Sequence, residues 1–208
     1  IMEIQDKQKK VIFLDRDGTI IKDGSAFWEE PHFVDHAKEG IGMLYTLGYE
    51  LVIVTNQCHI AKGHSTFEHF NSVNKWITDS LLPHGINFLA FYVCPHHPEG
   101  NIPELTKVCD CRKPLPGMLL QAAKEHNIDL KESIMIGDSY SDVIAGLRAG
   151  CTPILLTDKF GQEPKWHKDA EFWTAPDLKA AALIAGLPNR ELIDKDKNIS
   201  SDLYKLLP

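Results

Sequence analysis

The sequence Val11-Ile12-Phe13-Leu14-Asp15-Arg16-Asp17-Gly18-Thr19 joins a short apolar run directly to two carboxylates and a glycine. The β-branched and aromatic residues at its start predict a buried strand over residues 11–14. In open α/β sheets, ligands bind beyond the carboxyl ends of the strands. The stretch therefore predicts a functional site at the end of a strand, with Asp15 and Asp17 in it.

Strand and helix patterns alternate along the rest of the chain. Apolar runs predict strands over residues 50–54, 88–93, 133–136 and 152–156. Apolar spacing of three or four predicts helices over residues 37–47, 65–81 with Ser65 as N-cap, 118–126, 142–149 and 177–185. Alternation of this kind predicts βαβ units with right-handed crossovers. We therefore expect an α/β fold, a Rossmann-like parallel sheet flanked by helices on both faces.

Length and composition limit the class of protein. The 208 residues suit one domain better than two, so residues 1–208 are expected to form a single domain, with no role assigned to the polar tail 188–208. The net charge of −7 argues against nucleic acid and anionic membranes as partners and favours a small phosphorylated metabolite. We expect neither a transmembrane segment nor a signal peptide. The odd number of cysteines, three of them clustered, suits a reducing compartment, and a cytoplasmic monomer is expected.

Polar and charged residues follow four of the predicted strands. They are Asp15 and Asp17, Thr55, Cys94, and Asp138, with Arg112 and Lys113 arriving after a cysteine-rich loop. Parallel strands bring their carboxyl ends to one edge, so this edge combines carboxylates, a hydroxyl and cations. Phosphoryl transfer requires that mixture. The side chains of Asp15, Asp17 and Asp138 are candidates to hold Mg²⁺, and Thr55 and Lys113 to hold a phosphate.

The two carboxylates of the first motif suggest a division of labour. Environments that push the two pKa values apart give one ionised nucleophile and one proton donor. In this interpretation Asp15 attacks phosphorus to form an aspartyl-phosphate, while Asp17 protonates the leaving oxygen and then helps water to hydrolyse the intermediate.

Structural explanations exist for each of these residues taken alone. The first two carboxylates could belong to a turn or a helix cap, and Thr55 could be an ordinary strand-end residue. Lys113 could be a solvated surface charge. Asp138 and Asp142 could be the N-cap and a first-turn acid of the following helix.

Four motifs in this order resemble those of the haloacid-dehalogenase (HAD) superfamily. They are Asp15-Arg16-Asp17-Gly18-Thr19, Thr55-Asn56-Gln57, Arg112-Lys113-Pro114, and Gly137-Asp138-Ser139-Tyr140-Ser141-Asp142. The resemblance implies that the backbone carbonyl of Asp17 joins the side chains of Asp15 and Asp138 on Mg²⁺, with Asp142 supporting the metal shell. It also places Asn56, Gln57 and Arg112 with Thr55 and Lys113 in the substrate- and phosphate-binding set.

The loop over residues 94–112 has the spacing of a metal site. A Cys-x-His pair, Cys94 and His96, is followed after a gap by a Cys-x-Cys pair, Cys109 and Cys111. Thiolate and imidazole ligands suit tetrahedral zinc, and four protein ligands leave no open position, so the site is predicted to be structural. His97 could replace His96, and the alternative to a metal site is a set of buried free cysteines with incidental histidines.

Motifs in and after this loop narrow the resemblance. The stretches Cys94 to Gly100, Cys109 to Pro114 and Pro116 to Leu120 are similar to the D-glycero-D-manno-heptose-1,7-bisphosphate 7-phosphatase family, whose relatives include histidinol-phosphate phosphatases. This resemblance implies a Mg²⁺-dependent phosphatase without a large cap domain, acting in nucleotide-activated heptose synthesis for lipopolysaccharide. Four departures from the family pattern are expected at the rim of the pocket: Ile21, Cys58, His59 and Ser139.

Three alternatives remain at this point. One is a phosphatase for histidinol phosphate or another small metabolite. A second is a receiver-like signalling domain that retains its aspartyl-phosphate, although such a domain has no need for the acid at Asp17. A third is an interaction module organised by zinc, with tight zinc binding and no turnover.

Overall fold

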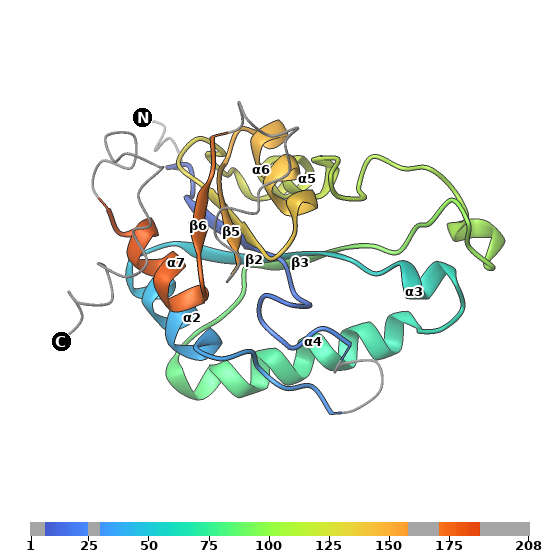
Figure 1. Ribbon diagram of the computed structural model, residues 1–208, viewed down its shortest axis with the longest axis horizontal. Coiled ribbons are helices and arrows are strands. Elements are labelled where there is room, and N and C mark those ends of the chain that lie inside the picture. The colour runs from blue at the N-terminus through green and yellow to red at the C-terminus, as the bar shows by residue number, and fades with distance from the viewer. Residues whose placement is uncertain (1–6, 25–29, 158–170, 188–208) are drawn as a thin grey trace, which may run out of the picture.

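A computed structural model describes residues 7–24, 30–157 and 171–187; the tail 188–208 lies outside the described residues. Its centre is one sheet of six parallel strands in the order β3-β2-β1-β4-β5-β6 (Figure 1). The strands are β1 (Val11–Leu14), β2 (Glu50–Asn56), β3 (Ala90–Cys94), β4 (Ile134–Gly137), β5 (Thr152–Leu156) and β6 (Trp173–Ala175). The predicted parallel sheet is confirmed.

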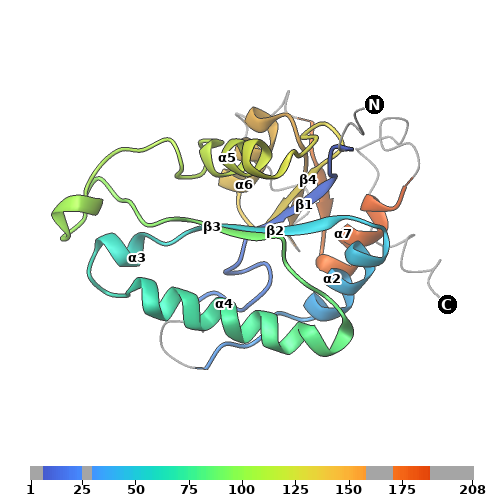
Figure 2. The same ribbon diagram turned by 180° about the vertical axis from the view of Figure 1, so that it is seen from behind.

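Helices cover both faces of the sheet (Figures 1 and 2). One face carries α2 (Ala37–Thr46), α4 (Phe67–Leu81) and α7 (Leu178–Ala185), and the other carries α5 (Gly117–His126) and α6 (Tyr140–Ala149). Side chains alternate along a strand, so Ile12 and Leu14 of β1 pack into the first layer while Val11 and Phe13 pack into the second. Burial of β1 on both faces explains its unbroken apolar sequence.

The strand order changes direction at β1, which pairs with β2 on one side and with β4 on the other. The chain therefore leaves the carboxyl ends of β1 and β4 toward opposite sides of the sheet. Such a switch point opens a crevice beyond the strand ends, where ligands of open α/β sheets bind. Asp15 follows β1 at this point and Asp138 follows β4.

The helix boundaries refine the predictions made from sequence. The N-cap of α4 is Thr66, whose hydroxyl accepts from the backbone N–H of His69, so the prediction of Ser65 as N-cap is wrong. The N-cap of α6 is Ser139, which excludes that role for Asp138. Asp142 does stand in the first turn of α6, where its carboxylate completes a capping box with the Ser139 backbone.

Some short elements were not predicted. They are β6, α3 (Cys58–Ala61) and the 3₁₀ turns Leu82–His84 and Pro103–Leu105. None is long enough to show a period of apolar residues. The strand predicted over residues 88–93 begins at Ala90 in the structure, where its pairing with β2 starts opposite Val52.

The described segments after β1 and β2 contain no large cap. Within the described residues, α2 is the only helix between β1 and β2, while α3, α4 and a 3₁₀ turn stand between β2 and β3. No helix in the described part of the chain is both long and apolar enough to cross a membrane.

Candidate active site

Three carboxylates converge at the switch point of the sheet. One oxygen each from Asp15, Asp138 and Asp142 lies within 4.8 Å of the others. Two glycines permit this approach, because a Cβ at Gly18 would collide with the carboxylate of Asp138 and a Cβ at Gly137 with that of Asp142. Gly18 also has a φ of +83°, which L side chains rarely adopt. The glycines of both motifs are therefore required by the close packing of the acids.

Lys113 lies between two of these carboxylates. Its Nζ is 2.8 Å from Asp15 Oδ1 and 2.6 Å from Asp142 Oδ1, and it donates to the backbone carbonyl of Val54 at 2.8 Å. The Lys113 side chain is only 1% exposed, which rules out the alternative of a solvated surface charge. The side-chain amide of Asn56 fixes the Lys113 backbone, accepting from its N–H and donating to its carbonyl, both at 3.0 Å.

Burial and mutual repulsion shift the titration of this cluster. Burial raises the pKa of Asp15 to about 7 even though the neighbouring Lys113 ammonium lowers it. Burial, followed by the charge of Asp142, raises the pKa of Asp138 to about 6. Burial lowers the pKa of Lys113, but the two carboxylates outweigh that effect and raise it. The ammonium thus stays charged while Asp15 and Asp138 hold their protons unusually well.

The donor set fits a hard divalent cation. Carboxylate oxygens are the ligands that Mg²⁺ prefers, and three carboxylates face a single ammonium here. Burial raises the pKa of Asp15 and Asp138 and so disfavours their charged forms, which a divalent cation at this position would favour. The cluster includes Asp142 directly, whereas the sequence resemblance gave that residue only a supporting role.

The carboxylate of Asp17 does not belong to this cluster and is held by a separate set of donors. Its carboxylate accepts from Arg16 Nε at 3.1 Å and Nη2 at 3.3 Å, and from Gln57 Nε2 at 2.6 Å. Gln57 also donates to the hydroxyl of Thr55 at 3.0 Å, which links the first and second motifs. Thr55 is buried at the end of β2, between the strand and the site.

Two residues of this network were not predicted as site residues. Arg16 is 3% exposed, and its Nη1 donates to Asn74 Oδ1 on α4 at 3.4 Å. Because Arg16 follows Asp15 directly in the sequence, its place in the active-site network could have been inferred from the first motif. The only signal for Asn74 is that it interrupts the apolar face of α4 with an amide.

A cavity of about 140 Å³ opens beside Asp17. Its lining comes from the loops after β1 and β2 and from the start of α4: Arg16, Asp17, Asp23, Gly24, Asn56, Gln57, Cys58, His59, Ser65 and His69. The predicted positions of Cys58 and His59 at the pocket are therefore confirmed. The prediction that Ile21 lies at the rim is wrong, because Ile21 is fully buried in the core. Ser139 is the N-cap of α6 and does not line this cavity.

The four predicted zinc ligands lie together. The Sγ of Cys109 is 3.5 Å from that of Cys94 and 3.3 Å from that of Cys111, and His96 Nδ1 is 3.2 Å from Cys111 Sγ. A tetrahedron with metal–sulfur bonds of about 2.3 Å has edges slightly under about 4 Å, so the group has the dimensions of a zinc site. His97 accepts instead from the backbone of Glu99, which favours His96 as the ligand.

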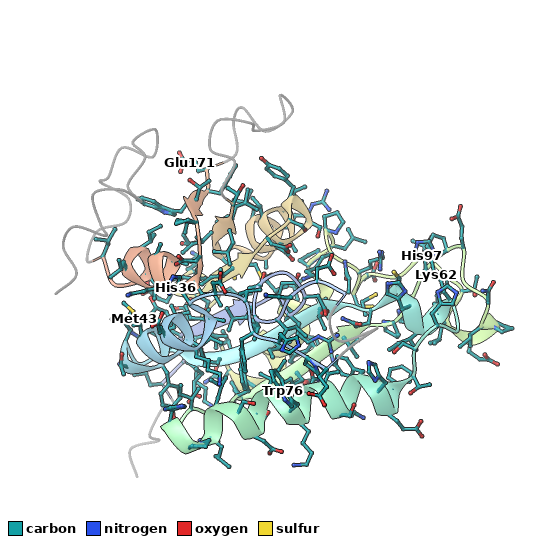
Figure 3. The ribbon with its side chains drawn as sticks, turned by 60° about the horizontal axis from the view of Figure 1, so that its bottom comes forward. His36, Met43, Lys62, Trp76, His97 and Glu171 are labelled. Atoms are coloured by element: carbon teal, nitrogen blue, oxygen red, sulfur yellow. The ribbon has the colours of Figure 1, made fainter. Side chains whose placement is uncertain are left out.

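The cysteine-rich loop, residues 94–112, is tied to the pocket through α3. The carbonyl of Ala61 accepts from the backbone N–H groups of Asn101 and Ile102, and the Asn101 side chain donates to the carbonyl of Lys62. In Figure 3, Lys62 and His97 lie together at this end of the molecule. Arg112 reaches back to the carbonyl of His96 at 3.5 Å. A cation held by the thiols would therefore stiffen both the pocket wall and the approach to Lys113.

Comparison with known proteins places these features in a family. Residues 110–181 match the profile of the HAD-hydrolase-like family. The chain is 46% identical over 140 residues to D-glycero-beta-D-manno-heptose-1,7-bisphosphate 7-phosphatase of Yersinia pestis, covering 66% of this chain and 74% of the relative. It is 42% identical over 149 residues to D-glycero-alpha-D-manno-heptose-1,7-bisphosphate 7-phosphatase of Photorhabdus laumondii, covering 71% and 81%.

A solved structure agrees with these relatives. The D,D-heptose 1,7-bisphosphate phosphatase of B. bronchiseptica, complexed with magnesium and phosphate, superposes with a TM-score of 0.70 at 30% identity. The superposition covers 83% of this chain and 96% of that one. The likeness therefore extends over almost the whole of the solved protein.

Proposed function

The chain belongs to the D-glycero-D-manno-heptose-1,7-bisphosphate 7-phosphatase family of HAD-like hydrolases, and from this we propose that it removes the 7-phosphate of that sugar bisphosphate. The observation that carries the proposal is the group of Asp15, Asp138, Asp142 and Lys113 at the switch point, in which Lys113 and Asp142 are buried and Asp138 is exposed, beside a cavity lined by Asp17. This group combines a nucleophile, sites for a cation and a proton donor. The product would serve nucleotide-activated heptose synthesis for lipopolysaccharide.

We assign the nucleophile to Asp15 and the proton transfers to Asp17. An oxygen of Asp15 attacks phosphorus, and the bond from phosphorus to the sugar oxygen breaks as Asp17 protonates that oxygen. Water then attacks the aspartyl-phosphate and gives its proton to Asp17, and the bond to Asp15 breaks. Lys113 and the Thr55 hydroxyl are proposed to hold the phosphoryl oxygens, with Gln57 and Arg112 at the edge of the site.

Asn56 contributes to this site indirectly. Both polar atoms of its amide bind the Lys113 backbone, so we propose that it orients the lysine and does not itself grip the phosphate. Gln57 similarly couples Asp17 to Thr55.

The proposed metals have separate roles. Asp15, Asp138 and Asp142, with the backbone carbonyl of Asp17, would hold Mg²⁺, which when bound offsets the repulsion between nucleophile and phosphate. Cys94, His96, Cys109 and Cys111 would hold a structural zinc. All five cysteines are free thiols, which suits a reducing compartment, and we propose a cytoplasmic location. A monomeric state stays a prediction.

A panel of phosphate esters tests the substrate. We expect kcat/KM for heptose 1,7-bisphosphate to exceed the values for histidinol phosphate and for heptose 7-phosphate lacking the second phosphate. Comparing the α- and β-anomers belongs in the same panel, because the similar proteins from Photorhabdus laumondii and Yersinia pestis are named for different anomers. A preference for histidinol phosphate would overturn the heptose assignment and leave the phosphatase intact.

A further inference from the structure

The geometry points to Asn74 of α4 as a positioning residue for Asp17, acting through the guanidinium of Arg16. This inference rests on the acid/base role proposed above for Asp17. Nothing in the sequence motifs assigns a role to α4, which packs beneath the loop after β1 (Figures 1 and 2). The contacts of Arg16 connect α4 to Asp17.

Arg16 is a buried cation whose donors are divided between two partners. Nε and Nη2 form a two-point contact with the Asp17 carboxylate, and the Nη2–Oδ2 distance is 3.0 Å. The remaining arm, Nη1, donates to Asn74 Oδ1, and the face of the Phe70 ring lies 5.3 Å below the guanidinium carbon. A planar guanidinium held on one arm and one face has little freedom to turn. The orientation of its other two donors is thereby set by α4.

Asn74 is an exception on its helix. The other buried residues of α4 are Phe70, Val73, Ile77 and Leu81, all apolar, yet Asn74 is only 6% exposed. An amide at this position adds nothing to the apolar packing, and its buried oxygen requires a donor, which Arg16 provides. Asparagine is also neutral, so it holds the guanidinium without competing for the charge that Asp17 requires.

A second anchor makes the position of Asp17 sensitive to the first. Gln57 fixes the carboxylate from the β2 side at 2.6 Å, and Arg16 fixes it from the α4 side. A proton donor is effective only within hydrogen-bond reach of the leaving oxygen. When Arg16 is free to turn, the carboxylate is held by Gln57 alone and can rotate away from the leaving group.

This role predicts a dependence on the leaving group. An alkyl phosphate, such as a sugar phosphate, expels a strongly basic oxygen that requires a proton from Asp17. An aryl phosphate such as p-nitrophenyl phosphate expels a stable anion that requires none. A residue that merely supports the fold changes both rates equally, whereas a residue that positions Asp17 changes mainly the first.

The experiment compares kcat/KM for a sugar phosphate and for p-nitrophenyl phosphate in the full-length, metal-loaded protein. For Asn74→Leu we expect kcat/KM for the sugar phosphate to fall about 10-fold or more, while kcat/KM for p-nitrophenyl phosphate falls less than about 3-fold. The first loss is a part of the ~10²-fold or greater acceleration that general acid catalysis supplies. Asn74→Asp should show the same selectivity, because a carboxylate there draws the guanidinium away from Asp17. Arg16→Lys keeps the positive charge but loses the two-point contact with Asp17, so it should show this selectivity more strongly.

The matched control is Ile77→Val, a buried substitution on the same face of α4. It should lower the melting temperature and leave the ratio of the two substrates unchanged. Equal losses on both esters in Asn74→Leu and Asn74→Asp, or no loss in either, would overturn the inference. A wild-type protein that hydrolyses both esters and rejects heptose bisphosphate would overturn the substrate assignment alone, and Asp17→Asn without selectivity would overturn the acid/base role.

Discussion

At the scale of single residues, the site is governed by an imbalance of charge. Lys113 neutralises part of the field of Asp15 and Asp142, and Asp138 adds a third carboxylate nearby. In the proposed mechanism Asp15 must be ionised to attack phosphorus, yet burial raises its pKa to about 7. A divalent cation among the acids favours their ionised forms, so cation binding and activation of the nucleophile are one event.

This coupling predicts that magnesium binding depends on pH. The folded-state pKa values of Asp15, about 7, and Asp138, about 6, both lie above the ordinary 3.8. In the metal-free protein these groups bind more protons when folded than when unfolded, so their contribution to stability is lost as pH rises from about 4 to about 7. Protons and Mg²⁺ compete for the same oxygens in that window.

We therefore expect Mg²⁺ to raise the melting temperature more at about pH 8 than at about pH 5.5, because fewer protons must be displaced. Differential scanning fluorimetry with and without Mg²⁺ across this range measures the effect. Asp138→Asn should weaken the response at both pH values. An Mg²⁺-induced shift of equal size at the two pH values in the wild type would contradict the account.

At the scale of elements, we propose that the cysteine-rich loop takes the place of a cap. It hydrogen-bonds to α3, which contributes Cys58 and His59 to the cavity, and it leads into Arg112 and Lys113. Burial raises the pKa of the Cys94 and Cys111 thiols, which favours their protonated forms in the absence of a cation. Zinc binding would release protons and close the loop into a rigid wall.

Removing one ligand tests this role of the loop. We expect Cys109→Ser to lose most of its zinc, to melt at a lower temperature, and to raise KM by about 10-fold or more with a smaller effect on kcat, because the loop positions the substrate. Metal analysis, thermal melting and steady-state kinetics measure the three effects. Val108→Thr, an exposed neighbour outside the ligand set, is the control. Unchanged KM in a zinc-depleted Cys109→Ser protein would refute the organising role.

Two glycines of α2 allow a matched test of helix packing. A Cβ at Gly40 would collide with the backbone of Leu178 in α7, whereas a Cβ at Gly42 would meet only the tip of Ile86 at 3.8 Å. Gly40→Ala is expected to lower the free energy of unfolding by about 1–3 kcal/mol through overpacking. Gly42→Ala should raise it by up to about 1 kcal/mol, since alanine favours the helix. Chemical denaturation measures both, and equal effects would contradict the α2–α7 contact.

At the scale of the whole molecule, the sheet and the convergence of the site were predictable because their signals are local. Four of the core strands are apolar runs followed by polar residues, and parallel strands bring Asp15, Thr55 and Asp138 to one edge whatever the details of packing. Elements that form because of contacts with residues far away in the sequence could not be predicted from local patterns. Strand β6 exists because Trp173 pairs beside Ile154, and a run of three residues has no period to detect.

The same distinction applies to individual side chains. The burial of Lys113 depends on Asn56, a residue far away in sequence that clamps its backbone. Ile21 was assigned to the rim because it departs from a family pattern, but its position next to the core of β1 decides its burial. The link from Asn74 to Arg16 requires α4 to cross beneath the first motif, which no local pattern encodes.

The central claim is that Asp15 carries the phosphoryl group during turnover. Rapid acid quenching of the enzyme with heptose 1,7-bisphosphate, followed by mass spectrometry of its peptides, tests this most directly. We expect a phosphate adduct on the peptide that contains Asp15, and no adduct in Asp15→Asn, which should have no turnover. With p-nitrophenyl phosphate, whose leaving group needs no proton, the adduct should be more abundant in Asp17→Asn because the second step loses its base. Full turnover with no phosphate on the protein at any time, or phosphate on a different residue, would contradict the account.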